Sequence, residues 1–280
     1  MPTHPASLAR AAMRWAALAA FVTSSTAGRA DEPAVPDLTV DVALVLAVDA
    51  SSSIHPAQAR LQREGHAQAL RSNAVNRAIA EGPVGCIAVT YVEWAGVGAL
   101  RTVLPWTKLC NPADAAASAE DILRLGDTGT ERRGRGRTSL SFAIEASSLL
   151  LDRFPGEATR KVVDISSNGT NNDGIPVTQS RDKAVGRGHV INAIVLSAVE
   201  VGVTDDLPGY FRQSVIGGPA SFVIAPHGPD DYVAALRRKL VLEIAGLSDR
   251  AADAGTMRLA FHAGRSGQIA IGPEGGSWRN

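Results

Sequence analysis

The sequence predicts an α/β fold: a doubly wound, mostly parallel sheet with helices on both faces and one antiparallel edge strand. Two patterns indicate this fold. Short apolar runs with the composition of buried strands alternate along the chain with segments of helical length and periodicity. The alternation extends over about two hundred residues, which is enough for one domain.

The first predicted strand covers residues 42–48, an uninterrupted apolar run. A helix over residues 56–70 follows, with a proline at its start. Two apolar runs, residues 86–94 and 100–106, flank a glycine-containing turn and predict an antiparallel hairpin. After the hairpin, the sequence predicts helices over residues 112–125, 138–151, 177–185 and 230–245, and strands over residues 161–166, 189–196 and 221–225.

Both ends of the chain differ from this pattern. Arg10 and Arg14 precede an apolar run, and small residues lead to Ala30, an order typical of a secretory signal (residues 1–30) cleaved after Ala30. No later run reaches the roughly 18 apolar residues of a membrane span, so we expect an exported protein without stable membrane insertion. The remaining chain is predicted to comprise a short linker (31–37), one domain (38–247) and a glycine-rich, loosely ordered tail (248–280).

Charge and aromatic content argue against nucleic acid as a partner. The chain carries 28 Lys and Arg residues against 28 Asp and Glu residues, so no net positive charge attracts a polyanion. Aromatic residues make up 5% of the chain and do not alternate with basic ones, so a stacking platform for bases is not expected.

The two cysteines, Cys86 and Cys110, lie at the outer ends of the predicted hairpin. A hairpin centred on Gly98 places them opposite each other, so a disulfide between them is geometrically reasonable. Closing a loop of this size would stabilise the fold by roughly 3–4 kcal/mol in the chain-entropy description. Two buried free thiols are the alternative, which an oxidising compartment disfavours.

The end of the first predicted strand carries candidate metal ligands. Asp49, Ser51 and Ser53 alternate directly after the apolar run, so one carboxylate and two hydroxyls come from a single loop. Hard oxygen ligands of this kind suit Mg²⁺. Alternatively, these side chains only cap the turn by bonding to nearby backbone groups.

Two other segments are predicted to reach the same edge of the sheet. In a doubly wound sheet the ligand site lies beyond the carboxyl ends of the strands, where the strand order reverses. A polar loop, residues 167–174, follows one predicted strand, and Thr138 begins a helix after the Gly- and Arg-rich loop 126–137. Their side chains are therefore expected near Asp49.

The Asp-x-Ser-x-Ser run at residues 49–53, Thr138 and the Asn168-Gly169 turn together resemble the von Willebrand factor type A (vWA) domain with its metal-ion-dependent adhesion site (MIDAS). Further motifs over about residues 38–247 resemble one family of exported, vWA-like bacterial proteins with no assigned function, which implies a periplasmic or secreted location. These motifs are Leu61-Gln62-Arg63-Glu64-Gly65, Glu93-Trp94-Ala95-Gly96, Pro105-Trp106, Asn171-Asn172-Asp173-Gly174, Val215-Ile216-Gly217-Gly218 and Arg238-Lys239-Leu240.

The resemblance implies a site for Mg²⁺, or for Mn²⁺ or Ca²⁺, with Asp49, Ser51, Ser53 and Thr138 as matching ligands. Asn168 departs from the pattern, because vWA domains typically carry Asp at this position. An amide oxygen can still ligate a metal or hold a ligating water, but one negative charge is lost. If the position acts through water, this loss weakens metal binding by about 10–100-fold. Asp173, in the same loop, is a candidate to compensate.

Four arginines immediately precede Thr138 and are expected to border the metal position: Arg132, Arg133, Arg135 and Arg137. Their functional interpretation is attraction of an acidic ligand, since in vWA domains a Glu or Asp of the partner completes the metal shell. The alternative is a solvated loop with no specific role.

These features predict a binding module, not an enzyme: an exported protein that uses a divalent metal to bind an acidic group on a protein partner. A scaffold or interaction domain with a degraded, metal-free site is the alternative, for which Asn168 is the reason. A metal-dependent hydrolase is a weaker interpretation, because Mg²⁺ with oxygen ligands also serves phosphoryl chemistry, but the sequence presents no general base.

Overall fold

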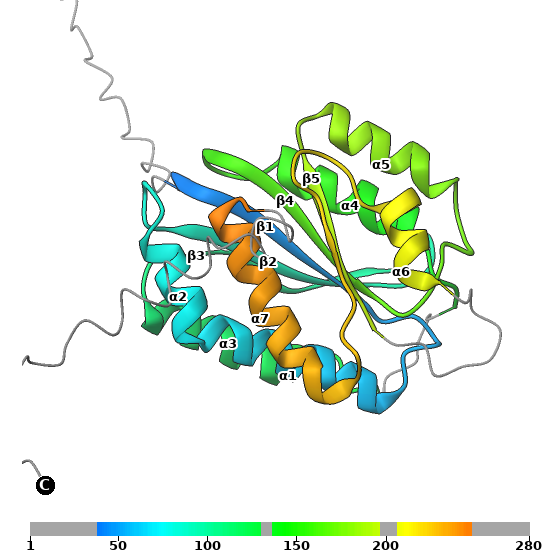
Figure 1. Ribbon diagram of the computed structural model, residues 1–280, viewed down its shortest axis with the longest axis horizontal. Helices are drawn as coiled ribbons and strands as arrows, with labels where there is room; N and C mark the ends of the chain where they lie inside the picture. The colour runs from blue at the N-terminus through cyan, green and yellow to red at the C-terminus, as the bar shows by residue number, and fades with distance from the viewer. Residues whose placement is uncertain (1–37, 130–135, 197–205, 248–280) are drawn as a thin grey trace, which may run out of the picture. The chain divides into compact units, whose positions relative to one another are not determined.

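The structure is a computed structural model that describes residues 38–129, 136–196 and 206–247. In these residues a six-stranded sheet has the order β3-β2-β1-β4-β5-β6 and is flanked by helices (Figure 1). Only β2 and β3 pair in antiparallel fashion, while all other neighbours in this sheet are parallel. The predicted fold class, with its single antiparallel edge strand, is confirmed.

The bounds of the elements agree closely with the sequence-based expectations. The strands are β1 (Val40–Asp49), β2 (Ile87–Trp94), β3 (Leu100–Leu109), β4 (Ala158–Ser167), β5 (Val190–Val195) and β6 (Val223–Ile224). The helices are α1 (Pro56–Arg71), α2 (Asn73–Ala80), α3 (Pro112–Leu125), α4 (Leu140–Asp152), α5 (Val177–Gly186), α6 (Leu207–Tyr210), the π-helical turn η1 (Phe211–Val215) and α7 (Pro229–Ala245). Helices α2 and α6 and the turn η1 were not predicted.

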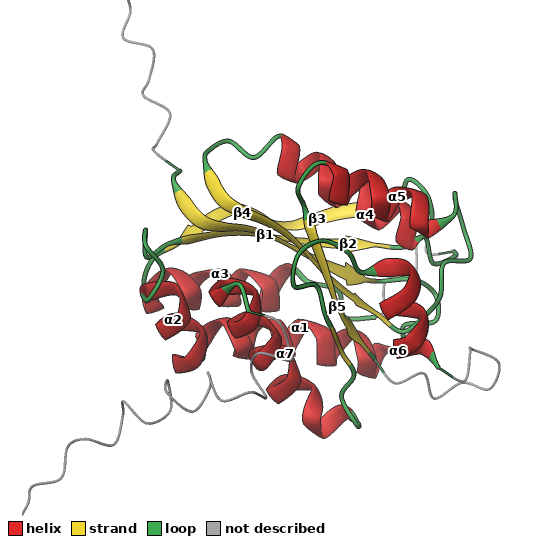
Figure 2. Ribbon diagram, turned by 45° about the horizontal axis from the view of Figure 1, so that its top comes forward, coloured by secondary structure: helices red, strands yellow, loops and turns green. Residues whose placement is uncertain are grey.

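Strand β1 lies at the centre of the sheet and is buried on both faces, as its uninterrupted apolar run predicts. Val42, Leu44 and Leu46 belong to the core cluster formed with α1, α2, α3 and α7. Ala43 and Val45 belong to the cluster on the opposite face, formed with α4, α5 and the α6–η1 segment. Figure 2 shows these two helical layers on either side of the sheet.

Helix α4 begins at Leu140, two residues later than predicted. The reason is Ser139, whose hydroxyl accepts a hydrogen bond from the backbone N–H of Phe142 and caps the helix. Thr138 therefore lies in the loop before the cap, not in the helix. Thr138 is therefore a loop residue at the carboxyl edge of the sheet.

The β2–β3 hairpin carries the predicted disulfide. Cys86 and Cys110 are bonded to each other, with their Cα atoms 4.2 Å apart. Ile87 pairs with Leu109 at the outer end of the hairpin, so the register places the two cysteines side by side.

Several expectations concern residues outside those that the structure describes. These are the secretory signal (1–30), the linker (31–37), the tail (248–280) and three of the four arginines, Arg132, Arg133 and Arg135. Within the described ranges, no helix has the length and apolarity that crossing a membrane requires.

Candidate functional site

Asp49 ends β1, and its carboxylate is almost fully buried, with 1% of the residue exposed. One carboxylate oxygen accepts the backbone N–H of Ser51 at 2.7 Å, and the other accepts the hydroxyl of Ser167 at 2.5 Å. Burial raises the pKa of Asp49, although the hydrogen bonds from Ser167 and Ser51 oppose this rise. A nearby cation would favour the ionised form of this carboxylate.

Next to Asp49, four side-chain oxygens form a continuous chain of contacts, which we call the hydroxyl line: Thr138, Ser51, Ser53 and Asn168. Thr138 Oγ1 donates to Ser51 Oγ at 3.2 Å, and the hydroxyls of Ser51 and Ser53 are 3.1 Å apart. Ser53 Oγ donates to Asn168 Oδ1 at 2.9 Å. The structure thus brings together side chains from the β1–α1 loop, from the loop before α4 and from the end of β4.

The consecutive distances in the hydroxyl line, which are hydrogen-bond distances, are also close to those between neighbouring ligands of a small octahedral cation. Neighbouring ligands at right angles on Mg²⁺, with bonds of about 2.0–2.1 Å, lie about 2.9 Å apart. Consecutive oxygens in the hydroxyl line are separated by 2.9, 3.1 and 3.2 Å. Within the described ranges, no group of three or more His, Cys, Asp or Glu residues could hold a metal, so a metal here would depend on these neutral oxygens and Asp49.

Asn168 is held in one orientation. Its amide nitrogen donates to the main-chain oxygen of Ser53 at 3.1 Å and to Gln58 Oε1 at 3.2 Å. These two acceptors require the nitrogen on their side, so the amide oxygen faces the Ser53 hydroxyl. Gln58, in the first turn of α1, therefore fixes which atom of Asn168 the site presents.

Asp173 lies outside the hydroxyl line. Its Oδ2 accepts the backbone N–H of Val97 at 2.9 Å, which joins the loop after β4 to the turn between β2 and β3. Among the described residues, this carboxylate makes no hydrogen bond to the hydroxyl line, and its compensation for Asn168 stays a prediction. The neighbouring Asn172 holds the backbone of a proposed ligand, because Asn172 Oδ1 accepts the backbone N–H of Thr138 at 2.8 Å.

Arg137 is exposed beside the site and is the only one of the four predicted arginines among the described residues. Its Nη1 donates to the main-chain oxygen of Asn172 at 3.3 Å. The adjacent Gly136 accepts the hydroxyl of Ser52 at 2.7 Å. Two contacts therefore tie this end of the basic loop to the segments that carry the hydroxyl line.

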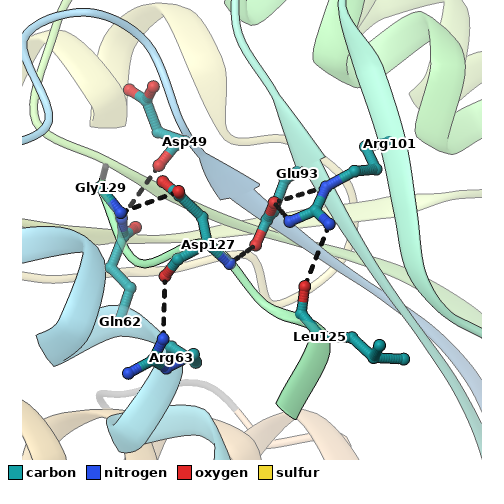
Figure 3. Close-up of polar contacts among 8 residues, drawn as sticks. All are labelled: Asp49, Gln62, Arg63, Glu93, Arg101, Leu125, Asp127 and Gly129. Carbon is teal, nitrogen blue, oxygen red and sulfur yellow. Dashed lines mark hydrogen bonds and ion pairs between the residues drawn. The ribbon is translucent and has the colours of Figure 1, made fainter. Parts of the chain in front are cut away.

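A second polar group lies at the end of the neighbouring strand β2. Glu93 is 4% exposed, and its carboxylate contacts Arg101 of β3 at 2.5 Å and accepts the backbone N–H of Asp127 at 2.5 Å. Burial raises the pKa of Glu93, while the contacts with Asp127 and Arg101 oppose this rise. Figure 3 shows this group and, beside it, Gln62 in contact with Asp49. The contacts fasten the loop after α3 to β2, next to the site.

Sequence reasoning missed several residues that complete the site: Gln58, Gln62, Ser167 and Asn172. Ser167 precedes Asn168 in the strand-end sequence Ser166-Ser167-Asn168, which was the available signal. The role of Ser167 depends on the pairing of β1 with β4, in which Val48 is opposite Ser166. A local motif does not contain this information.

The family described as "Protein of unknown function (DUF1194)" matches residues 39–248. Among solved structures, a von Willebrand factor type A protein from Catenulispora acidiphila is similar, with a TM-score of 0.51 and 14% identity. The similarity covers 74% of this chain and 43% of that chain, so this chain spans less than half the length of that protein. At this identity the likeness shows the fold alone. The comparison with curated proteins finds no match.

Two further solved structures are more distantly similar. One is the manganese-loaded TRAP protein of Plasmodium vivax, with a TM-score of 0.47, 15% identity and 73% of each chain covered. The other is proximal thread matrix protein 1 from the mussel byssus, with a zinc-occupied MIDAS motif, a TM-score of 0.46 and 17% identity, covering 75% of this chain and 48% of that chain.

Proposed function

We propose a function for this chain, which belongs to the family described as "Protein of unknown function (DUF1194)" and has the fold of a von Willebrand factor type A domain. The proposed function is that of an exported binding module, which uses a divalent metal to bind an acidic group on a protein partner. One observation carries the proposal: the oxygens of the hydroxyl line have the spacing of neighbouring ligands around a small octahedral cation.

The charge of the site favours an acidic partner. Asp49 supplies a carboxylate that accepts the backbone N–H of Ser51, and the other proposed ligands are the neutral oxygens of the hydroxyl line. A divalent cation held there would supply positive charge and an open ligand position. Because one carboxylate leaves that charge only partly balanced, an outside carboxylate gains from approaching it. Asn168 in place of Asp increases this imbalance.

The basic loop supports the same kind of partner. Arg137 is exposed and fastened beside the hydroxyl line, and Arg132, Arg133 and Arg135 precede it in the sequence. Clustered positive charge accelerates the encounter with an acidic surface, and this effect weakens as salt is added. We assign the four arginines to this steering role.

Export and domain organisation complete the proposal. A disulfide between Cys86 and Cys110 is in keeping with an oxidising compartment, the periplasm or the medium. We assign residues 1–30 to a signal removed after Ala30, residues 38–247 to the vWA domain, and residues 248–280 to a tail.

A metal-free scaffold is the second candidate function, and one observation favours it. The hydroxyl line is closed by hydrogen bonds among its own members, from Thr138 through Ser51 and Ser53 to Asn168, without any ion. In that case a partner would bind without metal, through exposed groups such as Ser52 and Arg137 beside the buried Ser51, Thr138 and Asn168. A metal-dependent hydrolase has no comparable observation in its favour.

Calorimetric titration with Mg²⁺, Mn²⁺ and Ca²⁺ separates these functions. The wild-type protein should bind one ion, and Thr138→Ala and Asp49→Ala should abolish the heat of binding. Ser52→Ala is the matched control, because this exposed hydroxyl lies between two proposed ligands in the sequence and donates to the main-chain oxygen of Gly136. Absence of binding heat in the wild-type protein would favour the metal-free scaffold, and ester turnover lost in Asp49→Ala would favour the hydrolase.

A further inference from the structure

Gln62 of α1 links the proposed metal site to a more distant part of the core. It is 1% exposed, and its Nε2 donates to the main-chain oxygen of Asp49 at 2.9 Å (Figure 3). Its Oε1 accepts the hydroxyl of Ser166 of β4 at 2.7 Å. Ser166 Oγ is also 3.0 Å from the hydroxyl of Tyr232 of α7. We call these four residues, Asp49, Gln62, Ser166 and Tyr232, the glutamine line.

The direction of every hydrogen bond in the glutamine line is determined. A main-chain carbonyl can only accept, so the nitrogen of the Gln62 amide must face Asp49 and its oxygen must face Ser166. Ser166 uses its single hydrogen on Gln62, so Tyr232 must donate to Ser166. Burial raises the pKa of Tyr232, which keeps this hydroxyl neutral and able to donate. All the bonds therefore point from Tyr232 toward Asp49.

Packing holds Tyr232 at the start of this line. A Cβ atom added at Gly65 would lie 2.9 Å from Cε1 of the Tyr232 ring, so the ring packs directly on the glycine. Gln62 and Gly65 are three residues apart and share one face of α1. The motif Gln62-x-x-Gly65 thus combines a hydrogen-bonding side chain with the space that its distant partner needs.

The glutamine line ends on the peptide group from which the ligand loop leaves β1. Ser51, two residues later, donates its N–H to the carboxylate of Asp49 at 2.7 Å and is the first of the two proposed serine ligands in this loop. A shift of the Asp49 carbonyl therefore moves Ser51 relative to Thr138, which comes from a different segment. Mg²⁺ demands near-ideal octahedral geometry, so small shifts of this kind weaken its binding.

We propose that Gln62 is a positioning residue for the metal site, which it serves by fixing the main-chain carbonyl of Asp49 through the glutamine line. This inference rests on the proposed function. Loss of a hydrogen-bonding partner outside the ligand shell typically weakens metal binding by 10–100-fold, so Gln62→Met should weaken Mn²⁺ binding by about 10-fold. Tyr232→Phe removes only the most distant bond and should weaken Mn²⁺ binding less, by about twofold to threefold.

The test compares Mn²⁺ affinity with stability in the full-length protein. Val75→Ala serves as the control, because Val75 is a buried core residue of α2 whose truncation lowers stability and whose apolar side chain takes no part in the hydrogen bonds of the glutamine line. If Gln62 had only a structural role, Gln62→Met and Val75→Ala would lower the melting temperature and leave the Mn²⁺ dissociation constant unchanged. A positioning role predicts a weakened affinity in Gln62→Met alone. Equal affinity in both variants and the wild type would overturn the inference.

A second measurement needs no metal and separates this inference from the proposed function. Hydrogen exchange of the Ser51 amide, followed by NMR in metal-free protein, reports how firmly the ligand loop is held. Gln62→Met should accelerate this exchange by about 10-fold while the exchange of α2 amides stays as in the wild type. If the wild type binds no Mn²⁺, the proposed function fails. Faster exchange would then still support the role of Gln62 in fixing the loop, and unchanged exchange would contradict it.

Discussion

Ser53 and Asn168 hold each other through two hydrogen bonds. The Ser53 hydroxyl donates to Asn168 Oδ1 at 2.9 Å, and Asn168 Nδ2 donates back to the main-chain oxygen of Ser53 at 3.1 Å. The amide nitrogen also donates to Gln58 Oε1. An aspartate at this position would have no hydrogen to offer, so its carboxylate would face two acceptors. The contacts around residue 168 therefore suit an asparagine and do not suit an aspartate.

Asn168→Asp should change stability and metal binding in opposite directions. In metal-free protein, the main-chain oxygen of Ser53 would lose its donor and the new carboxylate would face this oxygen and Gln58 Oε1, which should lower the free energy of unfolding by about 1–3 kcal/mol. The added charge should tighten Mn²⁺ binding by about 10-fold. Denaturant unfolding and calorimetry check the two effects. Asn168→Ala, which removes the hydrogen bonds without adding charge, should lose stability without gaining affinity; a gain in Asn168→Ala would contradict this explanation.

Glu243 should contribute a fall in the free energy of unfolding as the pH rises, whereas His66 and His189, whose pKa values burial lowers from 6.5, contribute a rise up to about pH 6.5. The Glu243 carboxylate and that of Asp164 share the buried ammonium of Lys239, which lies 2.6 Å from Asp164 Oδ1. Burial, followed by the charge of Asp164, raises the pKa of Glu243 to about 8 from an ordinary 4.5. Between these values the folded protein keeps a proton that the unfolded chain releases, so stability is lost by up to about 1.4 kcal/mol per pH unit.

Glu243→Gln removes this titration and should flatten the dependence of stability on pH between about 5.5 and 8. Glu81→Gln is the control, because Glu81 is exposed and its substitution should leave the slope of the wild type unchanged. Urea unfolding at several pH values measures the slopes. Equal slopes in the wild type and Glu243→Gln would show that Glu243 is ionised in the folded protein throughout this range.

Gly65→Ala should destabilise the protein although alanine is the better helix former. Alanine gains about 1 kcal/mol in helix propensity, but its Cβ would lie 2.9 Å from the ring of Tyr232. We expect a net loss of about 1–3 kcal/mol from this overpacking. Gly186→Ala in α5 is the matched control: nothing lies within 4 Å of its added Cβ, so it should stabilise by roughly 0.5 kcal/mol. A stabilised Gly65→Ala variant would show that α7 and the Tyr232 ring can move away from α1 at little cost in free energy.

Removal of the disulfide should be costly. The Cys86–Cys110 bond spans a sequence separation of 24 residues, and its loss in Cys86→Ser/Cys110→Ser should lower the free energy of unfolding by about 3 kcal/mol. A reducing agent should have the same effect on the wild type and none on the double variant. If reduction leaves the unfolding midpoint of the wild type unchanged, the bond contributes little to stability.

The elements that the sequence predicts best have their signals within a few residues. Asn111, Pro112 and Gly126 bound α3, and both predicted ends agree with the structure because the cap, the first-turn proline and the terminal glycine are all local. Helix α2 was missed because Ser72 alone separates it from α1, ending one helix and capping the next through its hydroxyl. Helix α2 has eight residues, of which only Val75 and Ile79 are buried, so its apolar positions are too few to show a helical period.

The candidate site also has a part with local signals and a part without them. Asp49, Ser51 and Ser53 lie within five residues of sequence, and the rule that parallel strands end at one edge sufficed to add segments from elsewhere. The partners of Asp49 were not predictable, because Ser167 is 118 residues away and its role follows from strand register. Asp173 was proposed for the site by its proximity in the sequence, and its hydrogen bond from the backbone N–H of Val97 depends on a turn 76 residues away.

A crystal structure of the protein grown with Mn²⁺, with anomalous data collected at the manganese edge, tests the central claim most directly. We predict a single anomalous peak bound by Ser51, Ser53 and Thr138, with an acidic group or water in the open position. An absent peak, with the hydroxyls of Ser51, Ser53 and Thr138 still bonded to one another, would contradict it.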